Sequence, residues 1–178
     1  MHGVGLVRGI NVGASTRVAK ADLAAAFADA GFANVTTFLQ SGNVVFDADA
    51  VPTAAVAATV EAGIEKRSGV AARVVLLTEK QFRAVAAANP LLQDGDDHSK
   101  LMVTFLDHPV PGSLAVPEED AIQPELVRLG ERAVYQWCPL GVSKSKLKPA
   151  FWREVGSVAT GRNWRTVLRL IEELDARS

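Results

Sequence analysis

The sequence predicts an α+β protein whose first half has the βαββαβ order of a ferredoxin-like fold and whose second half is similarly layered. Short runs of β-branched and aromatic residues alternate with segments whose apolar residues recur at helical spacing. The order strand, helix, hairpin and helix then recurs in the second half, without an obvious closing strand. A diverged duplication would explain this recurrence, although no residue-level similarity between the halves supports it.

The first half is punctuated by glycines. Its expected elements are a strand over 4–10, a helix over 20–30, hairpin strands over 35–40 and 43–46, a helix over 53–68 and a strand over 73–77. Gly31 follows the first helix and Gly42 lies in the hairpin turn, two positions that favour a residue with positive φ. We therefore expect positive φ at both glycines.

The second half opens after a helix over 78–88, which a capping box of Thr78 and Gln81 begins. The later elements expected are a strand over 101–106, a short helix over 117–122, hairpin strands over 126–129 and 133–137, a short helix over 149–155 and a helix over 163–176. Asn163 is most simply the N-cap of the last helix, because its side-chain oxygen suits the first-turn N–H groups.

The boundary between the halves is expected in Asn89–Ser99, which holds proline, glycine and three aspartates without periodicity. This predicts a first half over 1–88, a linker over 89–99 and a second half over 100–178. A chain of 178 residues also fits one compact unit, so both organisations stay open.

Composition excludes several classes of protein. The net charge of −1 argues against a general nucleic-acid coat or a membrane-surface binder. Cys138 is the only cysteine, which rules out an intramolecular disulfide and a thiolate metal cluster. The histidines His2, His98 and His108 are scattered, so we expect no metal site, and no motif calls for a cofactor. Without a leader pattern or an apolar run of ~20 residues, we expect a cytoplasmic protein with no membrane partner.

Charge is unevenly distributed along the chain. Eight acidic side chains and one lysine lie between Gln93 and Glu125, whereas seven lysines or arginines and one glutamate lie between Gly141 and Leu170. The basic stretch indicates either an anion site or an electrostatic match to the acidic stretch within the fold.

A first group of candidate residues follows the first strand and the hairpin. In a split βαβ unit the first two strands run parallel, so Arg8 and Asn11 should share one rim of the sheet with the turn at Gln40, Ser41 and Asn43. These side chains are candidate ligand-binding groups. The alternative is local turn chemistry, in which Ser and Asn bond the neighbouring backbone.

A second group lies in the basic stretch. Lys144, Ser145 and Lys146 precede a helix, and Arg162 and Asn163 precede the last one. The helix between these two segments, over 149–155, is too short to carry its ends far apart, so we expect Lys144, Lys146 and Arg162 to converge on a solvent-accessible patch. Because helix N-termini attract anions, we expect this patch to bind phosphate. The alternative is a solvated basic loop.

Three motifs combine glycine and polar residues with neighbouring apolar runs: LVRGINVG at Leu6–Gly13, TFLQSGNVVF at Thr37–Phe46 and ATGRNWRTV at Ala159–Val167. The chain resembles the bacterial family known as domain of unknown function 1697, whose members read LLRGINVGG, TYIQSGNVVF, SKL and TTRNWNTV. The residues that match its motifs are Arg8, Asn11, Ser41, Asn43, Ser145, Lys146, Arg162, Asn163 and Trp164. Ala14 and Gly161 depart from the pattern, which usually has Gly and Thr there. The resemblance implies no particular activity or substrate.

The expected function is therefore non-catalytic binding of a phosphate-bearing small molecule or a nucleic acid. One alternative is an enzyme that acts on a small anionic substrate, with Ser41 or Ser145 in the polar chemistry. The other is that the motifs are purely structural. Catalytic residues and the oligomeric state are not predicted.

Overall fold

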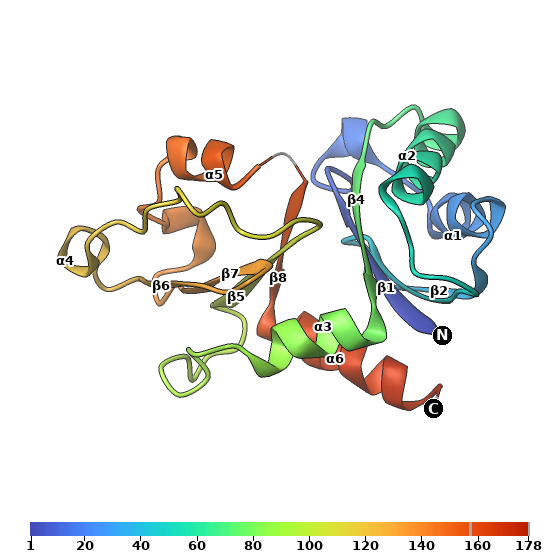
Figure 1. Ribbon diagram of the computed structural model, residues 1–178. Helices are drawn as coiled ribbons and strands as arrows, with labels where there is room; N and C mark the ends of the chain where they lie inside the picture. Colours follow the sequence, from blue (N-terminus) through green and yellow to red (C-terminus); the bar gives the residue numbers. More distant parts are fainter. Residues whose placement is uncertain (157, 178) are drawn as a thin grey trace. The chain divides into compact units, whose positions relative to one another are not determined.

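The computed structural model describes residues 1–156 and 158–177 (Figure 1). Within them the chain forms two four-stranded antiparallel sheets with helices, so the predicted α+β class is confirmed. The chain divides into two compact units, one of residues 1–82 and 170–178 and the other of residues 83–169. Each unit contains one of the sheets.

The first unit follows the expected βαββαβ order. Its elements are β1 (His2–Arg8), the 3₁₀ turn η1 (Ala14–Thr16), α1 (Lys20–Asp29), β2 (Ala33–Phe38), β3 (Asn43–Asp47), α2 (Ala54–Ser68) and β4 (Arg73–Thr78). The strand order is β2-β3-β1-β4, and every neighbouring pair is antiparallel. Because β3 lies between β1 and β2 and opposes both, β1 and β2 run parallel, as the split βαβ arrangement requires.

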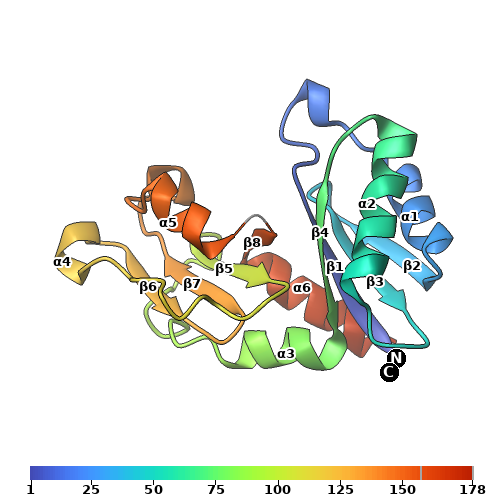
Figure 2. The same ribbon diagram turned by 45° about the horizontal axis from the view of Figure 1, so that its top comes forward.

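The helices α1 and α2 pack together on one face of this sheet (Figure 2). Two glycines of β1 make room for the aromatic part of this core. A Cβ on Gly3 would lie 2.5 Å from the ring of Phe46, and one on Gly5 would lie 2.5 Å from the ring of Phe27. Phe32 completes the cluster, with its ring centroid 4.0 Å from that of Phe46. Glycine in β1 is therefore a packing requirement of the aromatic core.

Two backbone predictions are confirmed in this unit. Gly31, after α1, has φ of +96°, and Gly42, in the four-residue turn between β2 and β3, has φ of +75°. A Cβ on Gly42 would also lie 2.8 Å from the Cβ of Val7, whereas Gly31 faces open space. The two glycines thus share a conformation but differ in how tightly they are enclosed.

The second unit repeats the order of the first. Its elements are the end of α3 (Glu79–Ala87), β5 (Leu101–Leu106), α4 (Glu119–Ile122), β6 (Leu126–Leu129), β7 (Ala133–Trp137), the 3₁₀ turn η2 (Val142–Lys144), α5 (Pro149–Val155), β8 (Ala159–Asn163) and the start of α6 (Trp164–Asp175). The strand order β6-β7-β5-β8 has the same pattern as β2-β3-β1-β4, again antiparallel throughout. Side chains from α4, α5 and one face of the sheet form its core.

The expectation of no closing strand in this half is wrong. The residues of β8 read ATGRN, with no large aliphatic side chain and no alternation, so periodicity could not find them. Pairing with β5 defines the strand, with Thr104 opposite Gly161 and Leu106 opposite Ala159. The remaining elements lie within a few residues of their expected bounds.

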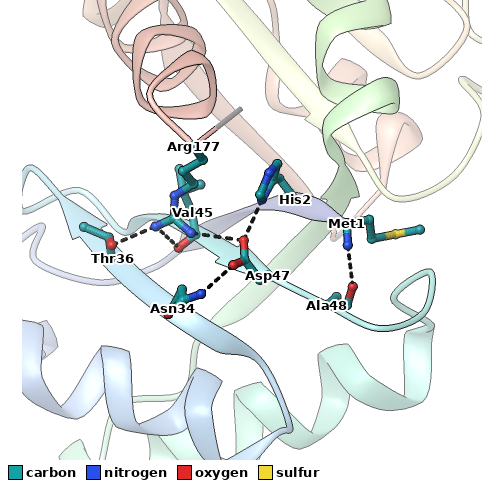
Figure 3. Close-up of polar contacts among 8 residues, drawn as sticks. All are labelled: Met1, His2, Asn34, Thr36, Val45, Asp47, Ala48 and Arg177. Carbon is teal, nitrogen blue, oxygen red and sulfur yellow. Dashed lines mark hydrogen bonds and ion pairs between the residues drawn. The ribbon is translucent and has the colours of Figure 1, made fainter.

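The segment after Arg169 groups with the first unit, not with the rest of the expected second half. Figure 3 shows the contacts of Arg177, whose guanidinium donates to the hydroxyl of Thr36 at 2.7 Å and lies 3.3 Å from the Asp47 carboxylate. Asp47 also bonds Asn34 at 2.7 Å and His2 at 2.6 Å. The expected loop over 89–99 has no helix or strand, but its role as a domain boundary stays a prediction.

Candidate functional site

A cavity of about 530 Å³ opens at one rim of the first sheet. It lies where α1 begins, beside the β1–α1 loop and the β2–β3 turn. Its lining residues are Asn11, Arg17, Val18, Ala19, Lys20, Asp22, Leu23, Leu39, Gln40 and Ser68.

Asn11 joins the two segments that form this rim. Its side-chain nitrogen donates to the carbonyl of Gln40 at 2.6 Å, and its side-chain oxygen accepts from the N–H of Val18 at 3.0 Å. The N–H of Val7 also donates to the carbonyl of Gly42 at 2.8 Å. The predicted proximity of the β1–α1 loop to the hairpin turn is therefore confirmed, although 29 positions separate Asn11 from Gln40.

Two of the three non-glycine residues with positive φ in the described ranges lie at this rim. Leu39 has φ of +55° and Asn11 has φ of +54°. The left-handed region is tolerated by asparagine but costs a branched apolar residue free energy. The Leu39 side chain is nevertheless 52% exposed at the edge of the cavity. The strained turn thus presents an apolar side chain to solvent instead of burying it.

The cavity also gathers positive charge at a helix start. Arg17 and Lys20 are exposed, and neither side chain has a hydrogen bond or ion pair within residues 1–156 and 158–177. The N-cap residue of α1 is Ala19, which has no side-chain oxygen to cap the first turn. Asp22 lies in the first turn of α1, a position at which helices favour an acidic residue.

Of the first group of candidates, Asn11 and Gln40 line this cavity, whereas Arg8, Ser41 and Asn43 are not among its lining residues. Arg8 is exposed at the end of β1. Asn43 is fully buried, and its amide donates to the carbonyl of Phe38 at 3.2 Å and to the Ser41 hydroxyl at 2.9 Å. These contacts are of the kind expected for local turn chemistry, the alternative considered for this residue.

Sequence reasoning missed Arg17 and Lys20. They lie outside the motifs, in the stretch STRVAKAD, where no element was expected before Lys20. The available signal was a pair of cations, one just before a helix and one at its first residue, with alanine at the N-cap position between them.

The second group of candidates separates in the structure. Lys144 and Lys146 line a small cavity of the second unit, and the nitrogen of Lys146 donates to the carbonyl of Gln123 at 2.5 Å. The Ser145 hydroxyl accepts from the N–H of Leu147 at 3.2 Å, which makes it part of a local turn. Asn163 accepts from the N–H of Thr166 at 3.0 Å, so the predicted N-cap of α6 is confirmed.

Arg162 is only 7% exposed, so its expected place on a solvent-accessible patch is wrong. It lies on β8, and its guanidinium donates to the hydroxyl of Thr160 at 2.7 Å and to the carbonyl of Gly161 at 2.8 Å. Burial lowers the pKa of Arg162 to about 10. The error follows from the missed strand, because a residue placed on a loop is expected to face solvent.

No three His, Cys, Asp or Glu side chains of residues 1–156 and 158–177 come together in a way that could hold a metal ion. Over the same residues, no helix has the length and apolar character needed to cross a membrane.

Comparison with known proteins agrees with this architecture. The conserved bacterial protein SP0830 from Streptococcus pneumoniae has a similar structure, with a TM-score of 0.68 over 94% of this chain and 95% of that one, at 20% sequence identity. No curated protein matches the sequence. The family model described as "Protein of unknown function (DUF1697)" matches residues 1–135. The chain therefore belongs to the DUF1697 family.

Proposed function

We propose that the protein binds a small phosphate-bearing ligand in the cavity at the start of α1. The observation that carries the proposal is the position of Arg17 and Lys20 beside an uncapped helix N-terminus in a cavity of about 530 Å³. First-turn N–H groups and the positive end of the helix dipole favour an anion there. Two exposed cations would add charge-assisted hydrogen bonds to phosphate oxygens.

The rest of the cavity suits the uncharged part of such a ligand. Its volume lies within the roughly 300–1,000 Å³ typical of small-molecule sites. Leu39 and Leu23 offer apolar surface, and the side-chain amide of Gln40 offers both a donor and an acceptor. These are groups that hold and orient a molecule, so we propose binding and not a reaction.

The concave shape favours a small molecule over a nucleic acid. A nucleic-acid surface depends on many cations that follow a phosphate backbone. The cavity has two cations beside one carboxylate, Asp22, and the whole chain has a net charge of −1. This small amount of positive charge suits one phosphate group better than the phosphate backbone of a nucleic acid.

The test is calorimetric titration of the full chain with pyrophosphate at low and high salt. The variant carries Arg17→Ala and Lys20→Ala. Its control carries Lys148→Ala and Arg153→Ala, which removes the same charge from exposed positions outside the cavity. We expect the cavity variant to bind about tenfold more weakly or worse, the control to bind like the wild type, and salt to weaken binding. Equal binding by both variants would contradict the proposal.

A further inference from the structure

The second unit contains a smaller cavity, between the segment that precedes β6 and the segment that follows β7. Its volume of about 10 Å³ is roughly that of one water molecule, and a primary ammonium group is of similar size. The lining residues are Ile122, Pro124, Glu125, Cys138, Pro139, Leu140, Gly141, Lys144 and Lys146.

A carboxyl group lies buried in this cavity with one oxygen unused. Glu125 is 4% exposed, and its Oε2 accepts from the Cys138 thiol at 3.6 Å. Its Oε1 is buried without a hydrogen-bond partner among the described residues. Burying an unpaired carboxyl oxygen costs free energy that the fold does not recover at this atom. The unused oxygen therefore lacks a donor that the described residues do not supply.

The thiol beside it is a donor and not a nucleophile. Burial, together with the neighbouring charge of Glu125, raises the pKa of Cys138 to about 12. The group therefore stays protonated near neutral pH and donates to Glu125 Oε2. This contact fixes the carboxyl group and leaves Oε1 for a ligand.

The first unit has the same strand order without a carboxyl group at the corresponding position. In the β2–β3 hairpin of the first unit, the paired residues farthest from the turn are Ala33 and Asp47. In the β6–β7 hairpin of the second unit, they are Leu126 and Trp137. The residues just beyond these pairs are Phe32 and Ala48 in the first unit, both buried in the apolar core. At the corresponding positions the second unit has Glu125 and Cys138. An apolar pair fills this place in one unit, so the polar pair in the other calls for a different explanation.

Two cations complete the arrangement on the solvent side. Lys144 and Lys146 are exposed yet line the same cavity as the buried Glu125. Lys146 is held by the carbonyl of Gln123, whereas the side chain of Lys144 has no hydrogen bond or ion pair within the described ranges. The site thus has a negative group at its base and positive groups towards solvent.

We propose that this cavity binds a small zwitterion, with a primary ammonium group on Glu125 Oε1 and an acidic group towards Lys144 and Lys146. A simple anion would meet the buried carboxyl group, and a simple cation would meet two lysines. A molecule that joins both charges through a short linker satisfies both ends. The site is separate from the proposed phosphate site and does not depend on it.

The experiment titrates the 178-residue chain with β-alanine, and with propionate and propylammonium as its two halves. Binding is followed by NMR at the backbone amides of Glu125 and Cys138. We expect β-alanine to shift these amides and each half to bind at least about tenfold more weakly. Glu125→Gln, which keeps size and hydrogen bonding, should weaken β-alanine binding by a similar factor, as should Lys144→Ala.

The controls are Glu118→Gln and Lys148→Ala, two exposed charges in neighbouring segments that do not line the cavity. Thermal unfolding shows whether each variant is folded, and Lys144→Ala decides the matter if Glu125→Gln is not. The proposal is overturned if β-alanine moves neither amide, if either half binds as tightly as β-alanine, or if folded Glu125→Gln and Lys144→Ala variants bind like the wild type.

Discussion

The two units repeat one strand order with different side chains at corresponding positions. In the first unit Gly3 and Gly5 of β1 admit the rings of Phe46 and Phe27, and Phe32 packs against them. The registers of β1 with β3 and of β5 with β7 place Met102 and Thr104 where those glycines are.

The aromatic rings of the second unit's core, Phe151 and Trp152, come from α5 and not from the sheet, and the position of Phe32 is taken by the buried Glu125. The two units thus share their strand order, whereas the side chains at a few corresponding positions decide whether the core there is apolar or polar. Residues that break the shared apolar pattern are the ones that call for a function.

The largest expected loss of stability comes from adding a side chain at Gly5 of β1, where the ring of Phe27 packs directly against the strand. Gly5→Ala would place a Cβ 2.5 Å from the ring of Phe27, and such overpacking costs about 1–3 kcal/mol of unfolding free energy. Urea denaturation measures the change. Gly112→Ala is the control, because a Cβ there meets no atom within 4 Å. Equal midpoints for both variants would mean that the aromatic core does not depend on glycine.

The next prediction compares Gly31 and Gly42, which both have positive φ but differ in how closely other atoms surround them. Gly42→Ala should cost strain plus a clash with Val7, about 1–3 kcal/mol in all, because its Cβ would lie 2.8 Å from that residue. Gly31→Val, in open space, should cost strain alone, on the order of 1 kcal/mol. Denaturation midpoints compare the two, and a larger loss at Gly31 would contradict the packing described.

The stability of the first unit should depend on pH through Asp47, at the position where the second unit has Trp137. Hydrogen bonds from Asn34 and His2 lower the pKa of Asp47 below 3.8. A lowered folded pKa contributes stability above the unfolded value, and this contribution is lost as the pH falls through the folded value. The stability difference between the wild type and Asp47→Asn should therefore shrink below pH 3.8. Asp49→Asn, at an exposed position, should show no such trend in pH-dependent denaturation.

The sequence predicted the elements that carry regular signals. The bounds of β5, β6, β7 and α5 agree with expectation, because each is an apolar run or begins with a favoured residue such as Pro149. The shared rim of Asn11 and Gln40 followed from topology alone. Local rules of strand, turn and cap chemistry were sufficient for these features.

The features that could not be predicted depend on tertiary packing. The strand β8 exists because β5 offers it an edge, and its short polar sequence has no periodicity of its own. Once it pairs, Arg162 becomes buried instead of exposed. The cavity near Arg17 and the unused oxygen of Glu125 depend on segments distant in sequence, which one chain without coordinates does not reveal.

If the proposed zwitterion site is correct, Glu125 and Cys138 serve binding and are not needed for the fold. The direct measurement is the unfolding free energy of a Glu125→Leu, Cys138→Ala variant, which gives the second unit an apolar pair like Phe32 and Ala48 of the first. Replacing a buried polar pair by apolar side chains is often neutral or stabilising. We predict unchanged or greater stability together with loss of β-alanine binding, whereas a loss of stability of about 2 kcal/mol or more would show that the pair supports the fold.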